Sequence, residues 1–219
     1  MSITIYGASL SPFVRKVRLA LAIKQLDYEL VPVIPMSPDQ PEEFVTHSPL
    51  RKIPLAHIDG NWIPDSSVIV SYLERTRPTP ALLPADPALA ARAEWFEEYA
   101  DSKMVLAIGA HMFFEIVLAP NILGREPDQA VIEKAKTVEI PEIFDYLESQ
   151  LEGDYLVGNT LGHADICVCS HFINMRYCGV SCDAERWPKV AAYIERITGG
   201  EVFASVLEAE KTFVEALGL

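Results

Sequence analysis

Ser11 is placed where a side-chain oxygen could act on a sulfur atom. It stands directly before Pro12 and an amphipathic segment that runs to Ile23. Serine is a favoured helix N-cap and proline suits the first helical position, so we expect a helix over residues 12–23. The Ser11 hydroxyl would then lie beside free N–H groups at the positive end of the helix dipole, where a thiolate is stabilised. The same position also fits a serine that only caps the helix.

Two further segments of the first 77 residues could bind a small polar ligand. Ile53-Pro54 precedes a β-type run, so the proline either starts an ordinary strand or forms a turn that leaves the backbone of Ile53 open to a ligand. Asp65-Ser66 opens a second helical pattern. The N–H groups and the hydroxyl at that helix start could hold a carboxylate, while the same residues cap the helix.

The order and spacing of three motifs resemble the glutathione transferase superfamily over nearly the whole chain. The motifs are S-P-F-V-R-K-V-R at residues 11–18, R-K-I-P-L at 51–55 and P-D-S-S-V-I at 64–69. The Ser-Pro-Phe start looks most like the serine-type branches, which include tau-like and bacterial members. The resemblance implies a cytosolic enzyme with a thioredoxin-like α/β domain, an all-helical C-terminal bundle, glutathione as co-substrate and a homodimeric state.

The resemblance also implies a role for each motif. Ser11 would be the catalytic residue that stabilises the glutathione thiolate. The backbone of Ile53, before a cis Pro54, would pair with the cysteinyl part of glutathione. Asp65 and Ser66 would hold its γ-glutamyl end, with the Asp65 carboxylate facing the ammonium group; many relatives have Glu or Gln in place of Asp65.

The group that holds the glycine carboxylate of glutathione is less well defined. Several serine-type relatives place a lysine at the position of Asp39. We therefore expect Lys52 to take that role, with Arg51 and His47 as alternatives.

Other sulfur partners are possible in the first domain. Tyrosine-type relatives use a tyrosine near the end of the first strand, which makes Tyr6 a rival to Ser11, and Ser9 is a second rival. The first cysteine of the chain is Cys167, so chemistry that needs a cysteine nucleophile in this domain is excluded. The Ser-Ser-Cys start of the zeta-type maleylacetoacetate isomerases is also missing.

The second substrate is expected to be apolar or electrophilic. Leu10 could form one wall of its pocket. A stripe along the first long helix after the linker could form another, although such a stripe more often belongs to a core. Its members are Tyr99, Met104, His111, Met112 and Phe113, and we expect His111 to be a spectator.

The pattern of apolar and turn residues predicts two domains, with a proline-rich linker at residues 78–87. Residues 1–77 should form a β-α-β unit followed by a β-hairpin and a helix. The predicted elements are strands 3–6, 28–33, 53–58 and 61–63 and helices 12–23 and 66–76. Residues 88–219 should form helices 88–118, 128–151 (kinked at Pro141), 162–175, 187–198 and 202–217. Asp165 should bond to the turn before its helix, which is a folding role.

Charge and composition limit the partners. Residues 1–77 hold eight basic and eight acidic residues, whereas residues 78–219 hold ten and 23, so the second domain carries the whole net charge of −13. Such a protein repels phosphate backbones, so we expect no nucleic acid partner. No apolar run approaches the roughly 18 residues of a membrane span, and the N-terminus lacks the pattern of a secretory signal. We therefore expect a cytoplasmic protein without a membrane partner.

The cysteines and one histidine are residue types that can bind a metal ion. His163 with Cys167, and Cys178 with Cys182, could be imagined on zinc, but no second pair at finger-like spacing accompanies them. We therefore expect no metal and treat these cysteines as small buried hydrophobes.

These observations favour an enzyme that transfers the glutathione sulfur to an electrophilic carbon. Two alternatives stay open. One is glutathione-dependent isomerisation or peroxide reduction at the same site. The other is a noncatalytic protein of the same fold that carries ligands or regulates a partner.

Overall fold

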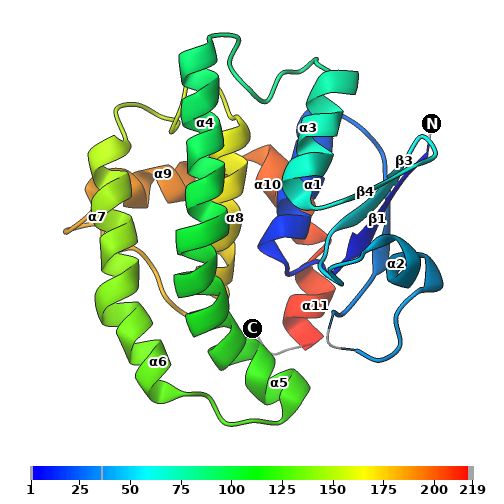
Figure 1. The fold of residues 1–219 in the computed structure, drawn as a ribbon. Helices are drawn as coiled ribbons and strands as arrows, with labels where there is room; N and C mark the ends of the chain where they lie inside the picture. Colours follow the sequence, from blue (N-terminus) through cyan, green and yellow to red (C-terminus); the bar gives the residue numbers. More distant parts are fainter. Residues whose placement is uncertain (1, 36, 217–219) are drawn as a thin grey trace.

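A small sheet with helices on both faces stands beside a larger helical bundle in the computed structural model, which describes residues 2–35 and 37–216 (Figure 1). The sheet has the order β2-β1-β3-β4, with β1 and β2 parallel and the other neighbours antiparallel. Its strands are β1 (Ile3–Gly7), β2 (Glu29–Pro32), β3 (Leu55–Ile58) and β4 (Asn61–Pro64). This arrangement confirms the predicted thioredoxin-like domain.

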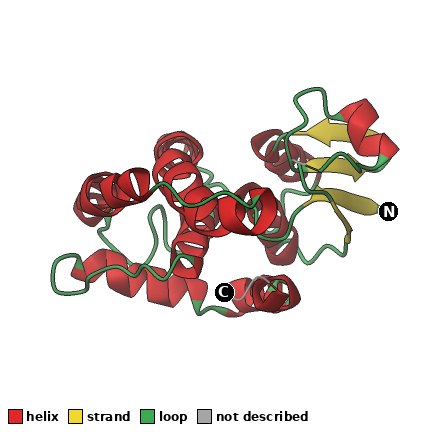
Figure 2. Ribbon diagram, turned by 90° about the horizontal axis from the view of Figure 1, so that it is seen from below, coloured by secondary structure: helices red, strands yellow, loops and turns green. Residues whose placement is uncertain are grey.

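Each face of the sheet has its own apolar cluster. Helices α1 (Pro12–Ile23) and α3 (Ser66–Thr76) cover one face, where Ile5 and Ala56 of the sheet pack in one core with Val17 and Ile69. The short helix α2 (Glu42–His47) covers the other face through Phe44. Figure 2 shows the strands between these two layers.

Helix α2 was not predicted from the sequence. It follows the proline-rich stretch and contains one buried residue, Phe44, so no apolar periodicity reveals it. Pro41 occupies its N-cap, and Glu42 and Glu43 lie in its first turn, where the helix dipole favours negative charge.

The second domain is all helical among the described residues, as predicted. Helices α4 (Pro87–Tyr99), η1 (Ala100–Leu118, π-helical) and α5 (Ala119–Leu123) form one continuous helix of 37 residues. The following elements are α6 (Gln129–Lys134), η2 (Ala135–Glu139, π-helical), α7 (Ile140–Gln150), α8 (His163–Tyr177), α9 (Pro188–Thr198), α10 (Glu201–Glu208) and α11 (Lys211–Ala216). Helix α8 is the centre of the bundle, because every residue from His163 to Met175 is buried.

Two predicted helix boundaries are wrong. The first long helix was expected to end before Pro120, but it continues to Leu123 and ends at Gly124, which has the left-handed conformation (φ 61°) typical of a helix C-cap. The last helix was expected to be continuous over residues 202–217. It breaks at Ala209–Glu210, because the Glu210 carboxylate turns inward to fully buried arginine side chains; Leu217 lies outside the described residues.

The continuous helix has the length and composition that a membrane span requires, with a mean hydropathy of 1.7 over 18 residues, contrary to what the sequence analysis expected. However, Met104, Ile108 and Met112 on this helix are fully buried in the main core of the protein. The helix therefore serves as a core helix of the bundle.

Basic residues of α1 hold the two domains together. Arg15 is fully buried and pairs with both carboxylate oxygens of Glu210 at 2.9 and 2.7 Å. Arg18 adds a bond to the same carboxylate at 3.2 Å and another to the carbonyl of Val206 at 3.1 Å. Helix α1 thus belongs to the first domain by sequence. The positive charges of its Arg15 and Arg18 are balanced by Glu210, near the end of the second domain.

Candidate functional site

Three motifs from distant parts of the first domain meet where the strands of the sheet end. The strand register pairs Tyr6 of β1 with Leu55 of β3, and Leu55 with Pro64 of β4. The chain leaves β1 toward Ser11, enters β3 from Ile53-Pro54 and leaves β4 toward Asp65 at this same end of the strands. The backbone N–H of Asp65 also donates to the carbonyl of Pro54 at 3.3 Å. The sheet therefore brings together the residues that the sequence singled out.

Ser11 caps α1 as predicted. Its backbone is extended (φ −70°, ψ 126°), and its hydroxyl accepts a bond from the N–H of Val14 at 3.4 Å. That distance exceeds the usual 2.9–3.0 Å of an N–H···O bond, so the hydroxyl is held loosely. The residue is half-buried, and the helix has no acidic side chain in its first turn. The hydroxyl can therefore turn toward a ligand at the positive end of the helix.

Gly7 allows this helix to approach the end of β1. A Cβ atom at this position would meet Cγ2 of Val14 at 2.4 Å, which is too close for any side chain. The glycine thus fixes the distance between the strand end and the first turn that Ser11 caps.

Asp65 and Ser66 occupy the start of α3 as predicted. Oδ1 of Asp65 accepts from the N–H groups of Ser67 at 2.9 Å and Val68 at 3.3 Å. Oδ2 makes no hydrogen bond among the described residues and is the oxygen that could face a ligand's ammonium group. Asp65 has φ 78°, which aspartate tolerates better than most residues, and Ser66 is buried.

The peptide bond between Ile53 and Pro54 is cis, as the resemblance implied. Lys52 and Arg51 lie beside it with exposed side chains. His47 is instead stacked on the ring of Trp62 at 4.2 Å, on the α2 side of the sheet. Of the three basic residues considered for the glycine carboxylate, Lys52 and Arg51 are free to move toward a ligand, whereas His47 is held by an aromatic partner.

The two rivals of Ser11 are less accessible. Tyr6 packs with Phe44 and Leu55 beneath α2, with its ring 5.6 Å from that of Trp62. Burial and, secondarily, the carboxylates of Glu43 and Glu29 raise the pKa of Tyr6, so its hydroxyl is a poorer proton donor than in water. Ser9 is buried.

The residues expected around the second substrate do not form one group. Leu10 packs with Phe113 and Val117 of η1 in a small apolar cluster next to Ser11. Met104 and Met112 are fully buried in the main core, so neither offers surface to a substrate.

Tyr99 and His111 face other helices of the bundle. The Tyr99 ring lies 4.7 Å from that of Tyr146 in α7, and burial raises the pKa of Tyr99 to about 12. His111 bonds Glu139 of η2 through Nδ1 at 2.6 Å. Of the six side chains named for this pocket, Leu10 and Phe113 are the two that lie together, because the first long helix turns the others toward the core and α7.

Asn174 of α8 is a positioning residue that the sequence analysis missed. Its Nδ2 donates to the carbonyl of Leu10 at 3.0 Å, while its Oδ1 accepts from Arg15 at 2.7 Å. The second domain thus fixes the backbone next to Ser11 from beneath. The available signal was an asparagine between the apolar residues Ile173 and Met175, since a buried amide needs specific partners.

Comparison with known proteins agrees with this geometry. The profile described as "Glutathione S-transferase, N-terminal domain" matches residues 10–76, and "Glutathione S-transferase, C-terminal domain" matches residues 105–201. The chain is 34% identical over 162 residues to maleylacetoacetate isomerase of Rattus norvegicus. The matched region covers 73% of this chain and 71% of the relative. It belongs to the glutathione transferase superfamily.

Solved structures of similar proteins span almost the whole chain. A glutathione S-transferase from Rhodospirillum rubrum F11 superposes with a TM-score of 0.85 at 28% identity, covering 94% of this chain and 91% of that one. Another from Methylobacterium radiotolerans, in complex with glutathione sulfonate, has a TM-score of 0.76 at 26% identity, with 94% of each chain covered.

Proposed function

We propose that this protein binds glutathione at the strand ends beside Ser11 and transfers its sulfur to an electrophilic, apolar small molecule. The observation that carries the proposal is the position of Ser11, a loosely bonded and half-exposed hydroxyl at the N-terminus of α1. Membership of the glutathione transferase superfamily supports glutathione as the thiol.

Ser11 would act by stabilising the thiolate. A thiol pKa near 8.5 must fall by about 2 units for most of the sulfur to be ionised at neutral pH, which needs roughly 3 kcal/mol. One hydrogen bond to the charged sulfur contributes about 1.5–3 kcal/mol, and the helix N-terminus adds about 0.3–1 kcal/mol. These contributions suffice without a general base.

The rest of the site supplies orientation. The backbone of Ile53 can pair with the cysteinyl part of glutathione as an added strand would. Asp65 and Ser66 can hold its γ-glutamyl end, and Lys52 its glycine carboxylate. An electrophile would then lie against Leu10 and Phe113, which places its reactive carbon near the sulfur.

Glutathione-dependent isomerisation is the second candidate function. It is favoured by the similarity to the maleylacetoacetate isomerase of Rattus norvegicus at 34% identity. Such a reaction can use the same thiolate, which adds to the substrate and leaves again after a bond has rotated. The Ser-Ser-Cys start of the zeta-type enzymes is absent here, so the transferase reaction is our first choice.

The two reactions and the noncatalytic alternative can be separated with purified protein. Calorimetry measures glutathione affinity, a panel of aromatic and alkyl electrophiles tests conjugation, and maleylacetoacetate tests isomerisation. Each assay is repeated with Ser11→Ala and with Ser9→Ala as the matched control. Turnover that is lost in Ser11→Ala and kept in Ser9→Ala supports the proposal. Binding without turnover on any substrate would refute catalysis and favour a ligand carrier.

We also place the protein in the cytoplasm as part of this proposal. The fold of the family and the four unpaired cysteines are consistent with a reducing compartment.

A further inference from the structure

Three side chains with different donor atoms converge where α4 meets the start of α8. His163 and Cys167 lie one turn apart on α8, and their Nε2 and Sγ atoms are 3.8 Å apart. Glu97 of α4 brings Oε2 to 2.8 Å from the same Nε2. The three donor atoms all lie within 4.8 Å of one another, and both α8 residues are buried.

From this convergence we infer that Glu97, His163 and Cys167 form a binding site for a Zn²⁺ ion. Imidazole nitrogen, thiolate sulfur and carboxylate oxygen are the ligand types of zinc, which accepts such mixed sets in tetrahedral geometry. In the sequence, no second pair of ligands at finger-like spacing accompanies His163 and Cys167. Glu97 is 66 and 70 positions away along the chain, so only the fold reveals it.

The distances suit a tetrahedral ion. With usual zinc bond lengths, the donor atoms should be separated by about 3.4 Å for nitrogen and oxygen and by about 3.6 Å for nitrogen and sulfur. The observed separations are 2.8 and 3.8 Å. A displacement of Oε2 of Glu97 by about half an ångström away from Nε2 would bring the nitrogen–oxygen separation to the tetrahedral value.

A second shell of hydrogen bonds already holds the carboxylate. Lys16 of α1 donates to Oε1 of Glu97 at 2.9 Å, which leaves Oε2 for the ion. Lys16 also pairs with Asp101 at 2.7 Å, so its charge is balanced independently of Glu97. Such outer partners orient metal ligands and commonly affect affinity by about 10–100-fold.

The charge of the cluster also permits a divalent ion. Zinc ligands bind as thiolate, neutral imidazole and carboxylate, so the negative charges of Cys167 and Glu97 would balance the two positive charges of the ion in the loaded cluster.

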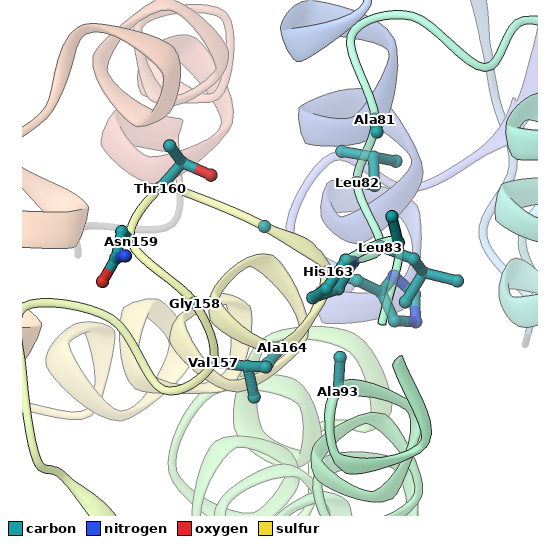
Figure 3. Close-up of a pocket in the computed structure, with 13 residues that line it drawn as sticks. Ala81, Leu82, Leu83, Ala93, Val157, Gly158, Asn159, Thr160, His163 and Ala164 are labelled. Carbon is teal, nitrogen blue, oxygen red and sulfur yellow. The ribbon is translucent and has the colours of Figure 1, made fainter. Parts of the chain in front are cut away.

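An adjacent cavity, which His163 lines, offers room for a further ligand. The cavity has a volume of about 380 Å³ and lies between the linker, α4 and the loop before α8. His163 lines it near Leu83, together with Ala93 and Ala164 (Figure 3). A water molecule from this side could complete a tetrahedron around the ion, because three protein ligands leave one position open.

Cobalt spectroscopy tests the site directly. The full-length protein is freed of metal with a chelator, kept reduced with a phosphine and titrated with Co²⁺. We expect a thiolate-to-cobalt band in the near ultraviolet and the intense visible bands of tetrahedral Co²⁺, saturating at one ion per chain and displaced by Zn²⁺. Cys167→Ser should abolish the near-ultraviolet band. Cys178→Ser, a half-buried cysteine at the other end of α8, should keep it.

Two further measurements keep the test decisive. Glu97→Gln should weaken Co²⁺ binding at least tenfold and leave the sulfur band in place. X-ray absorption of the zinc-loaded wild type needs no variant to fold, and it should show one sulfur at about 2.3 Å with nitrogen and oxygen at about 2.0–2.2 Å. A wild type without the sulfur band, a band unchanged in Cys167→Ser, or a shell of oxygen alone would overturn the inference.

Discussion

Ser11 is the residue whose removal best separates catalysis from folding. Ser11→Ala deletes the hydroxyl but keeps Pro12 and the helix start. The bound thiolate then loses about 1.5–3 kcal/mol, which corresponds to a rise of about 1–2 units in its pKa, because the stabilised form is the deprotonated one. We expect slow turnover at neutral pH, partial recovery toward pH 9 and little change in glutathione affinity. The dependence of kcat on pH measures this shift.

Tyr6→Phe is the matched control for this measurement. Tyr6 packs beneath α2 and has a raised pKa, so its loss should leave the pH profile of kcat unmoved. The opposite pattern, with a profile shifted by Tyr6→Phe and unmoved by Ser11→Ala, would make Ser11 only a helix cap.

Asp65→Asn distinguishes ligand binding from helix capping. Asparagine caps a helix as well as aspartate but carries no charge. We therefore expect the free energy of unfolding to stay nearly constant, while the glutathione Kd rises about 10- to 150-fold through the loss of a charged hydrogen bond of about 1.5–3 kcal/mol. Calorimetric titration and urea unfolding measure the two quantities. Ser71→Ala, later on the same helix α3, should change neither, and an unaltered Kd in Asp65→Asn would remove Asp65 from the site.

At the scale of elements, Asp165 fixes the start of α8. Its carboxylate accepts from the N–H groups of Leu156 and Gly162, each at 3.0 Å, and from the hydroxyl of Tyr193 at 2.9 Å. These bonds confirm the folding role that the sequence indicated. Asp165→Ala leaves three donors without an acceptor, and those of Leu156 and Tyr193 are buried, so the free energy of unfolding should fall by about 2–5 kcal/mol.

Urea denaturation checks this value, and Asp154→Ala is the control. Asp154 lies in the preceding loop with an exposed side chain, so its loss should cost less than about 1 kcal/mol. Equal destabilisation by the two variants would contradict the role of Asp165.

A second prediction at this scale concerns the break between α10 and α11. Glu210→Gln removes the one carboxylate that faces Arg15 and Arg18 among the described residues. It leaves two buried guanidinium groups without a counter-charge, which should lower the free energy of unfolding by about 3–5 kcal/mol. Glu208→Gln, two residues earlier with an exposed side chain, should be nearly neutral in the same unfolding experiment.

Local signals in the sequence were enough to predict the elements that carry the site. Ser11-Pro12 predicted the start of α1 from the conformational preferences of two adjacent residues. Ile53-Pro54 left a strand start and a turn both open, and the resemblance to the family favoured the cis turn before β3. The end of the sheet at which these segments meet then follows from the order and direction of the strands.

Contacts between distant residues could not be predicted in this way. Nothing near Arg15 identifies Glu210 as its partner, and nothing near His163 identifies Glu97. The apolar stripe of the long helix failed as a pocket prediction for the same reason. Periodicity shows which side chains share a face, but it does not show whether that face meets a substrate or another helix.

At the scale of the whole molecule, the division of charge suggests how two copies would associate. The first domain is neutral and the second carries −13, so two second domains would repel each other across a shared interface. We predict a homodimer in which the first domain of each copy contacts the second domain of the other. Light scattering at micromolar concentration should give twice the mass of one chain, and a monomer mass would refute the prediction.

The ion pairs between α1 and Glu210 have a consequence for synthesis of the protein. Arg15 leaves the ribosome early, but Glu210 is made 195 residues later. Until then the two guanidinium groups of α1 must stay in water, because burying them unpaired costs several kcal/mol each. The docking of the first domain onto the bundle therefore waits until the segment that holds Glu210 has been made.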